Sequence, residues 1–344
     1  MRFRTLGRSG LKISEITCGN WLTHDPDRIG ESKACVQAAL DAGITTFDTA
    51  DIYGAPNYGA AEEILGATLS GARRESVQIL TKVCLPSGPG PNDKGLSRKH
   101  IMESCTASLR RLQTDYVDLY QAHRYDEETP LEETMLAFAD LVRAGKVLYV
   151  GVSEWTAAQI HAAAALAKEL HVPLISNQPQ YSLLWRVIEA EVIPASVSLG
   201  MGQLVWSPLA QGVLAGKYLP DAPPPPDSRA AHERGARFVG RYMGRPVLEA
   251  VQRLATVAAD LGATLPQLAL AWVLHNPAVS SAIIGVSQPE QLADNLPVPD
   301  LDLTPEVLAT IDATLTDPEH GDLVERSPAK TAKPFEVMPA WRLT

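Results

Sequence analysis

The chain has 344 residues, 45% of them hydrophobic and 20% charged, and a formal net charge of -10. This composition is typical of a globular protein with a large core, so it excludes a disordered chain or a coiled coil. The acidic balance argues against nucleic acid or an anionic membrane as the main partner, because either would need a basic stripe. The sequence shows neither a signal-peptide pattern nor an apolar run of roughly 18 residues, so we expect a cytoplasmic protein.

Neither a disulfide framework nor a metal site is predicted. The four cysteines are scattered without a CxxC pair, which favours buried, reduced thiols. The eight histidines show no HxH or HExxH spacing, so no two imidazoles are expected to share one ion.

The chain is predicted to open with a hairpin in residues 1–15, where two short strands flank the turn Gly7-Arg8-Ser9-Gly10 and plug the main fold. Short apolar runs then alternate with longer amphipathic segments. Eight strands are predicted, at residues 16–19, 44–48, 77–82, 116–121, 147–151, 172–177, 202–206 and 281–285. Eight helices are predicted, near residues 31–42, 61–70, 97–111, 131–143, 156–169, 185–198, 248–261 and 288–295.

Eight strand–helix units without a Pro/Gly-rich linker predict an α/β fold, a single (β/α)8 TIM barrel that occupies residues 1–344 as one domain. The alternative is a doubly wound sheet, but no GxGxxG motif follows the first strand. Two segments interrupt the alternation. Residues 207–247 form a long loop after the seventh strand, which at this length is functional or disordered. Residues 317–344 form a polar tail, either draped over the barrel or, the explanation we prefer, a poorly ordered terminus.

Polar side chains follow the ends of neighbouring predicted strands. Asp48 ends one strand, Tyr53 follows in the next loop, Lys82 ends another strand, and His123 comes directly after the next. In such barrels the chemistry lies at the carboxyl ends of the strands. A carboxylate and an ammonium at buried strand ends are unfavourable unless paired, so we predict a buried Asp48–Lys82 ion pair.

The ion pair suggests a role for the tyrosine. An ammonium beside the phenol would lower the pKa of Tyr53 from about 10 toward a value suited to proton transfer. Tyr53 is therefore a candidate general acid. Each of these residues alone has a plainer explanation, because a loop histidine is usually structural and strand-end charges often form simple ion pairs. Asp51 has no evident partner and is expected to face solvent or a loop amide.

Taken together, Asp48, Tyr53, Lys82 and His123 resemble the catalytic tetrad of the aldo-keto reductases, in the contexts FDTADIYG, TK and QAHR. The resemblance runs from Leu6 to Asn295 and is strongest to the branch with the potassium-channel β-subunits and their bacterial relatives. It implies reduction of an aldehyde or ketone with a hydride from NADPH. Tyr53 would protonate the oxygen, Lys82 and Asp48 would tune that phenol, and His123 would orient the carbonyl.

The resemblance also assigns cofactor and substrate contacts. The ring of Trp206 would stack on the nicotinamide, and cations of the long loop would close over the pyrophosphate. The residues assigned to the cofactor are Gly19, Asn20, Trp21, Asp48, Ser153, Gln178, Trp206, Ser207, Pro208, Leu209, Gln211, Lys217, Arg229, Gly285, Ser287, Gln291 and Asn295. The residues assigned to the substrate are Trp21, Tyr53, His123 and Arg124.

Three departures from the family pattern refine these expectations. Glu154 stands where many relatives carry Asn or Arg, so we expect the contacts here from Ser153 and Gln178. Gln288 stands where some NADP-preferring relatives carry Arg, which leaves Ser287 and Gln291 to contact the 2′-phosphate without a nearby cation; NADP(H) is still preferred, with NAD(H) as the alternative. His123 is retained where the channel β-subunits carry Asn, which favours an active reductase over a nucleotide-binding regulatory subunit.

A third hypothesis, a metal-dependent barrel hydrolase, is disfavoured by the missing HxH motif. The substrate lies beyond what the sequence predicts, because variable loops set it in barrels. The oligomeric state is also left open.

Overall fold

The structure, a computed structural model, describes residues 1–21, 29–54, 57–226, 228–231, 233–296, 298 and 301–331. In this part of the chain, eight parallel strands close into a barrel in the order β10-β3-β4-β5-β6-β7-β8-β9. The strands are β3 (Ile16–Gly19), β4 (Thr46–Asp48), β5 (Gln78–Val83), β6 (Val117–Ala122), β7 (Val147–Val152), β8 (Leu174–Asn177), β9 (Gly202–Trp206) and β10 (Val279–Ile284). The predicted (β/α)8 barrel is confirmed, and the doubly wound alternative is wrong.

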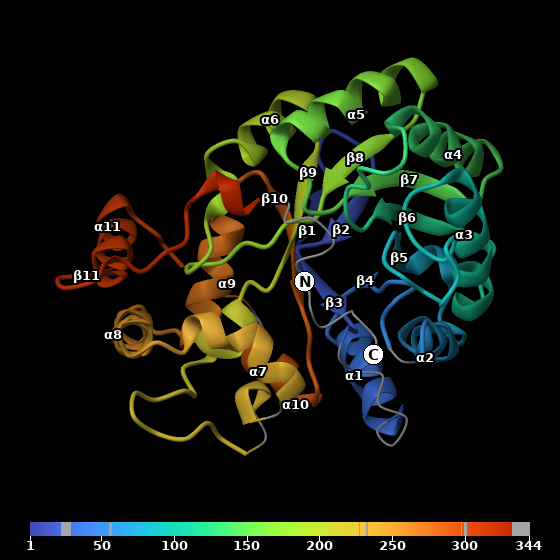
Figure 1. Cartoon of the computed structure of the whole chain (residues 1–344). Helices are drawn as coiled ribbons and strands as arrows, with labels where there is room; N and C mark the ends of the chain where they lie inside the picture. Colours follow the sequence, from blue (N-terminus) through green and yellow to red (C-terminus); the bar gives the residue numbers. More distant parts are fainter. Residues whose placement is uncertain are drawn as a thin grey trace.

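Helices surround the barrel (Figure 1). They are α1 (Ile29–Asp41), α2 (Ala60–Leu69), α3 (Arg98–Leu112), α4 (Leu131–Arg143), α5 (Ala157–Leu170), α6 (Val192–Leu199), α7 (Glu233–Val239), α8 (Arg245–Asp260), α9 (Leu265–His275), α10 (Glu290–Asn295) and α11 (Pro305–Thr314). Local sequence explains several ends. Ser97 caps α3 by accepting a hydrogen bond from the backbone of His100, and Thr156 forms a capping box with Gln159 at the start of α5.

The structure differs from the prediction in four helices, one of which, α7, lies in the segment predicted as a loop. A helix is expected over residues 185–198, but α6 begins only at Val192, because the backbone at Trp185 pairs with Glu325 near the C-terminus. Neither α9 nor α11 is expected from the sequence. In α9 nearly every side chain is buried, so the polar face that would have revealed a helical period is missing.

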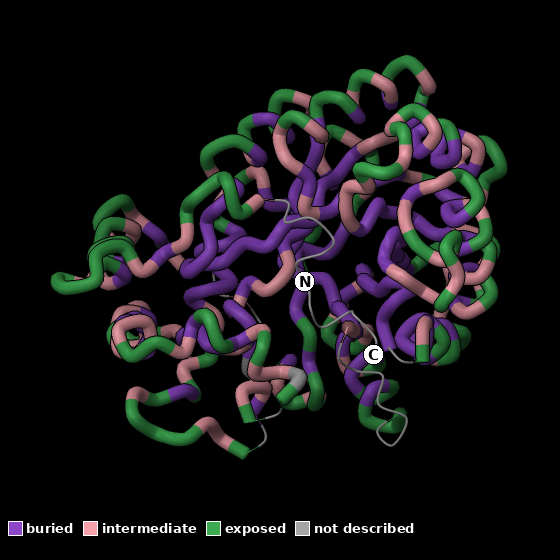
Figure 2. The backbone as a smooth tube through the Cα atoms, viewed as in Figure 1, coloured by how far each residue is buried: buried purple, intermediate pink, exposed green. Residues whose placement is uncertain are grey.

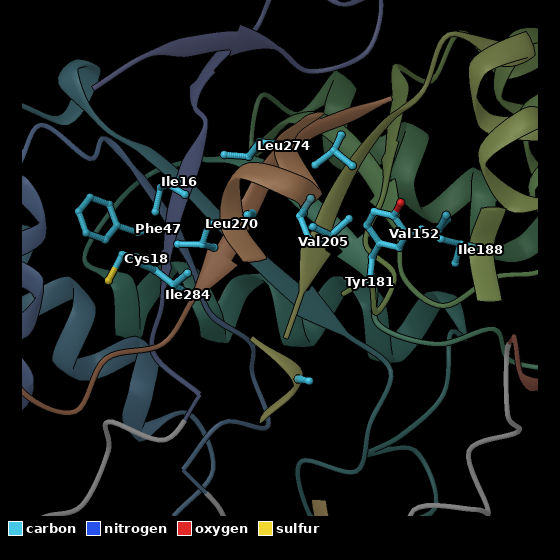
Figure 3. Close-up of a cluster of buried hydrophobic side chains, with 14 of the residues drawn as sticks. Ile16, Cys18, Phe47, Val152, Tyr181, Ile188, Val205, Leu270, Leu274 and Ile284 are labelled. Atoms are coloured by element: carbon cyan, nitrogen blue, oxygen red, sulfur yellow. The ribbon is translucent and has the colours of Figure 1, made fainter. Parts of the chain in front are cut away.

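Buried side chains lie on both sides of the barrel wall, so the strands appear as a continuous buried region in Figure 2. The outer layer packs the strands against the helices, with side chains such as Phe47, Val205 and Leu270 (Figure 3). The inner layer fills the barrel with Leu80, Leu119 and other apolar side chains. Parallel strands covered on both faces carry near-continuous apolar runs, which explains the sequence pattern.

The N-terminal hairpin closes one end of the barrel. Its strands, β1 (Phe3–Thr5) and β2 (Lys12–Ser14), pair in antiparallel fashion. Leu6 and Ile13 are fully buried in the inner layer of the barrel. The hydroxyl of Ser280, at the start of β10, donates to the Thr5 carbonyl, so the plug lies at the amino ends of the strands. The opposite end is left for chemistry.

The segment of residues 207–247, called the covering segment below, contains more regular structure than the predicted loop. It holds the 3-10 helices η4 (Ala210–Ala215), η5 (Arg229–Ala231) and η6 (Gly240–Tyr242) as well as α7. After α11, a hairpin of β11 (Thr316–Asp317) and β12 (Gly321–Asp322) precedes η7 (Pro328–Lys330), and residues 332–344 of the predicted tail lie outside the described residues.

Among the described helices, none alone is long and apolar enough to cross a membrane. The helices α8 and α9 meet that criterion only together, and they are bent by 84° relative to each other.

Candidate active site

The register of three adjacent strands brings the predicted polar residues together. Asp48, the last residue of β4, lies opposite Gly19 of β3 and Leu80 of β5, and Lys82 lies opposite Gln121 of β6. Side chains two positions apart share one face of a strand. Leu80 points into the apolar barrel interior, so Lys82 faces the same way, one layer nearer to the carboxyl end.

Lys82 and Asp48 form the predicted buried ion pair. The Lys82 Nζ lies 2.6 Å from Asp48 Oδ2 and donates to the Thr49 carbonyl at 2.6 Å. The second carboxylate oxygen, Asp48 Oδ1, accepts a hydrogen bond from Gln178 Nε2 at 2.8 Å. Burial lowers the pKa of Lys82, but Asp48 and Tyr53 raise it by more, so the net pKa is raised and the ammonium persists. The pair is thus well satisfied despite its burial.

The phenol of Tyr53 is held against this ion pair. Its hydroxyl lies 3.3 Å from Lys82 Nζ, and the ammonium also lies 4.8 Å from the centre of the ring. The expected lowering of the tyrosine pKa is wrong in its net direction. Burial raises the pKa of Tyr53, and this outweighs the opposing effect of Lys82, so the net pKa is above 10. At neutral pH Tyr53 is a protonated phenol, which suits a proton donor.

His123 completes the group as a neutral imidazole. Its ring meets the ring of Tyr53 edge to face, with centroids 5.7 Å apart and planes at 75°. Burial, Arg124 and Lys82 all lower the pKa of His123, to well below its usual value. Among the described residues, no partner accepts or donates at its buried Nδ1. The imidazole can therefore offer a hydrogen bond without carrying a charge.

A cleft of about 690 Å³ opens beside these residues. Tyr53, His123 and Arg124 line it, whereas Lys82 is fully buried behind them. It is also lined by every residue assigned to the cofactor from the sequence except Asn20, whose amide donates to the Ala61 carbonyl and which does not reach the cleft. The structure thus gathers into one cavity residues that span Gly19 to Asn295 in the sequence.

Trp206, at the end of β9, forms one wall of this cleft. Its indole Nε1 donates to Glu154 Oε1 at 2.9 Å. The same oxygen accepts the backbone N–H of Gln180 at 2.6 Å. Glu154, which the sequence marked only as a departure from a pattern, is therefore a hydrogen-bond acceptor behind the wall. Nearby, the Ser153 hydroxyl donates to the Gln178 carbonyl at 2.8 Å.

The covering segment contributes to the cleft on another side. The Arg229 guanidinium donates to the side chain of Gln211, which in turn donates to Ser207. Phe238 of α7 packs edge to face on Trp21, with centroids 4.9 Å apart. Sequence reasoning missed Phe238. Glu233 and Arg237, four residues apart, were the available signal that this part of the loop is helical.

Sequence reasoning also missed further apolar and small lining residues. They are Leu85, Gly212, Ala215, Gly235, Pro266, Ile283, Ile284 and Val286. They carry no chemical signal in the sequence, because apolar side chains in a cleft look like core.

Asp51 corrects a second expectation in part, because it is buried rather than facing solvent, whereas a backbone hydrogen bond from Ile52 fits the other half of that expectation, a loop amide. Only 1% of its surface is exposed, and its Oδ2 accepts a hydrogen bond from Ser104 of α3 at 2.7 Å. Burial, and then the nearby carboxylate of Glu62, raise the pKa of Asp51 to about 7. Glu62 is itself satisfied by Arg111 and Thr81.

Comparison with known proteins decides the family. A model of the Aldo/keto reductase family matches residues 15–316. The chain belongs to the aldo/keto reductase family. The resemblance seen in the sequence is thereby confirmed, and with it an oxidoreductase family whose members generally bind NADP(H).

Two of the proteins that this chain is similar to carry the name of a channel subunit. The chain is 42% identical over 322 residues to a protein of Oryza sativa subsp. japonica named probable voltage-gated potassium channel subunit beta, covering 92% of this chain and 97% of that protein. A protein of Arabidopsis thaliana with the same name shows the same identity and coverage. Among the described residues of this aldo/keto reductase, no three His, Cys, Asp or Glu side chains gather as they would around a metal ion.

Proposed function

We propose that this aldo/keto reductase reduces aldehydes or ketones to alcohols with NADPH. The observation that carries the proposal is a protonated Tyr53 whose hydroxyl lies 3.3 Å from the Lys82 ammonium and which lines a large cleft. A general acid needs a proton to give and a partner that stabilises the anion left behind. Tyr53 and Lys82 meet both needs.

The cleft offers donors that fit a nicotinamide dinucleotide. Trp206 presents a flat indole to a ring, and Lys217 and Arg229 present cations suited to a pyrophosphate. Ser287, Gln291 and Asn295 line the same cleft with polar groups. These residues would hold the cofactor, and bound NADPH would supply the hydride for the carbonyl carbon.

The residues of the chain would handle the proton and the developing charge. Tyr53 would donate its proton to the carbonyl oxygen, and Lys82 would stabilise the phenolate. Asp48 would keep Lys82 charged and in place through the 2.6 Å ion pair. The neutral His123 would orient the substrate by a hydrogen bond to the same oxygen. The reverse oxidation would use the same groups, with Tyr53 as the base.

NADPH is proposed over NADH because Ser287 and Gln291 place hydroxyl and amide groups in the cleft. The backbone N–H of Ser287 donates to Gln291 Oε1 at 2.9 Å. The preference would be measured as the ratio of kcat/KM with the two cofactors.

The alternative function is a nucleotide-binding regulatory subunit with little turnover. It is favoured by the names of the relatives, which are 42% identical over nearly the whole chain. It is disfavoured by His123, which lies in ring contact with Tyr53. The two functions differ in one measurable property, because a regulatory subunit would bind NADPH in stoichiometric amounts and scarcely oxidise it.

The test measures NADPH oxidation with 4-nitrobenzaldehyde and methylglyoxal. We expect Tyr53→Phe to lower kcat by about 100-fold to 10,000-fold, the usual contribution of a general acid, with NADPH still bound. The matched control is Tyr58→Phe, a half-buried tyrosine of the same loop, which should leave kcat within about twofold. If wild type and Tyr53→Phe are equally slow on a broad carbonyl panel, the catalytic assignment is wrong.

A further inference from the structure

Glu154 lies next to the cleft but does not line it. It lies two residues after the end of β7 and takes a left-handed backbone conformation, with φ of 59°. Such a conformation is uncommon for a residue with a side chain and is a reason to look for function. Here it accompanies a carboxylate that reaches across to the end of β9, where Trp206 does line the cleft.

One oxygen of Glu154 serves two donors. Its Oε1 accepts the indole N–H of Trp206 at 2.9 Å and the backbone N–H of Gln180 at 2.6 Å. The backbones of residues 179–181 and of Trp206 are also joined, since Trp206 N donates to Pro179 O and Tyr181 N donates to Trp206 O. These main-chain hydrogen bonds thus fix the position of the Trp206 backbone. The ring packs against the apolar inner layer, and its indole N–H makes its printed side-chain hydrogen bond, among the described residues, to Glu154, which therefore helps to set how the ring is turned.

The same contact reaches the covering segment. The side-chain amide of Gln180 donates to the hydroxyl of Tyr242 at 2.8 Å, and Tyr242 ends η6 in that segment. By holding the backbone of Gln180, Glu154 also supports one attachment point of the segment that carries Lys217 and Arg229.

We propose that Glu154 is a positioning residue for the nicotinamide nucleotide. Its carboxylate sets the orientation of the Trp206 indole, and through Gln180 it steadies the end of the covering segment, without touching the nucleotide itself. This inference rests on the proposed function, since it assigns Trp206 to the nucleotide. A ring whose orientation is set before binding loses less entropy on binding, so the effect belongs to affinity more than to the chemical step.

The two-donor geometry separates charge from hydrogen bonding. Both donors go to Oε1, and a glutamine in this position would present one carbonyl oxygen with two lone pairs. Glu154→Gln therefore keeps both bonds, in a weaker neutral form, whereas Glu154→Ala removes both. If Glu154 acts by positioning, the glutamine variant should bind NADPH nearly as tightly as wild type, and the alanine variant should bind it more weakly.

The experiment titrates NADPH into each variant and follows tryptophan fluorescence. We expect Glu154→Ala to raise the Kd for NADPH about 10-fold with kcat changed less than about threefold, and Glu154→Gln to raise the Kd no more than about threefold. The matched control is Glu63→Ala, an exposed carboxylate on α2, which should leave the Kd unchanged. Circular dichroism and urea unfolding check that each variant is folded.

A double variant shows whether Glu154 acts through Trp206. Trp206→Phe keeps an aromatic ring but removes the indole N–H, so adding Glu154→Ala to it should raise the Kd only about twofold further. Without nucleotide, the emission of Trp206, obtained by subtracting the Trp206→Phe spectrum, should shift in Glu154→Ala and not in Glu154→Gln. A full 10-fold effect in the Trp206→Phe background, or a wild-type Kd in Glu154→Ala, overturns the inference. If wild type itself fails to bind NADPH, the proposed function is wrong and this inference falls with it.

Discussion

Two aspartates three positions apart in one loop region are buried in opposite electrostatic surroundings. Asp48 faces the barrel interior, where Lys82 and Gln178 each satisfy one of its oxygens. Asp51 faces outward toward α2 and α3, where the Ser104 hydroxyl donates to one oxygen and the Ile52 backbone offers a further hydrogen bond, but no cation is paired with it as Lys82 is with Asp48 among the described residues. Its nearest acidic neighbour, Glu62, repels it.

The difference teaches that burial alone does not decide the charge of a carboxyl group. Beside Asp48 the buried ammonium of Lys82 keeps its charge, because the carboxylate raises the pKa of the lysine. At Asp51, by contrast, the burial penalty is offset only partly, and the carboxyl binds a proton up to about pH 7. Arg111 lowers the pKa of Asp51, but its guanidinium donates a hydrogen bond to Glu62, at 2.7 Å.

The largest effect should follow from removing the cation of the satisfied pair. Lys82→Met leaves Asp48 buried beside an apolar side chain, and we expect a loss of about 3–5 kcal/mol in the free energy of unfolding. Urea unfolding measures this loss. The control is Lys99→Met, an exposed lysine on α3, with a change of at most about 0.5 kcal/mol. A loss as small as that of the control would mean that the pair is not buried as described.

Removing the charge at Asp51 should have the opposite effect and raise the free energy of unfolding. The folded carboxyl keeps its proton to about pH 7, whereas the unfolded one loses it near 3.8, so the folded state binds more protons between these values. Stability therefore falls as pH rises from about 4 to about 7. Asp51→Asn should abolish this fall and raise the free energy of unfolding by about 2 kcal/mol at pH 8, with no gain near pH 4.

Unfolding curves at pH 4, 6 and 8 test this expectation. Asp115→Asn, at an exposed site, serves as the control and should change stability by less than about 0.5 kcal/mol at every pH. A gain in Asp51→Asn that is constant with pH would show that the carboxyl is not titrating, and a loss at pH 8 would show that its charge is stabilised.

A smaller effect is expected from the hydrogen bond between Ser104 and Asp51. Ser104→Ala removes a donor to the carboxylate, so the pKa of Asp51 should rise further above about 7, and stability at pH 8 should fall by about 1 kcal/mol. Carbon-13 NMR of the carboxyl group follows the titration. Thr106→Ala, on the exposed face of α3, is the control; an unchanged or lower midpoint in Ser104→Ala would contradict the assigned contact.

The contrast between the two aspartates also marks what sequence could predict. The Asp48–Lys82 pair follows from strand ends alone, because adjacent parallel strands bring their last residues to one rim. The neighbours of Asp51 come from helices packed outside the barrel. The spacing of residues in the sequence does not predict how a helix is rotated on a sheet. The predicted direction of the Tyr53 pKa was wrong for a related reason, because the depth at which the phenol is buried depends on the whole loop.

Other differences have equally local causes. Helix α9 is apolar on all sides, so its period is hidden. The chain near Trp185 pairs with Glu325, some 140 residues later, and such a contact leaves no local pattern. In the sequence Glu154 is only a departure from the family pattern, because its two donors, Trp206 and Gln180, lie at the ends of other strands. The residues assigned to the cofactor, apart from Asn20, line one cleft, and they were assigned from the family resemblance rather than from periodicity.

The circular order of the strands has a consequence for how such a protein can diversify. The residues proposed for proton transfer come from β4, β5, β6 and their loops, between residues 48 and 123, on neighbouring strands of the barrel. Most of the remaining cleft residues follow from β7 onward, between Ser153 and Asn295. Substitutions in the second half of the chain can therefore change which ligand the cleft binds, while the residues proposed for proton transfer, between 48 and 123, stay the same.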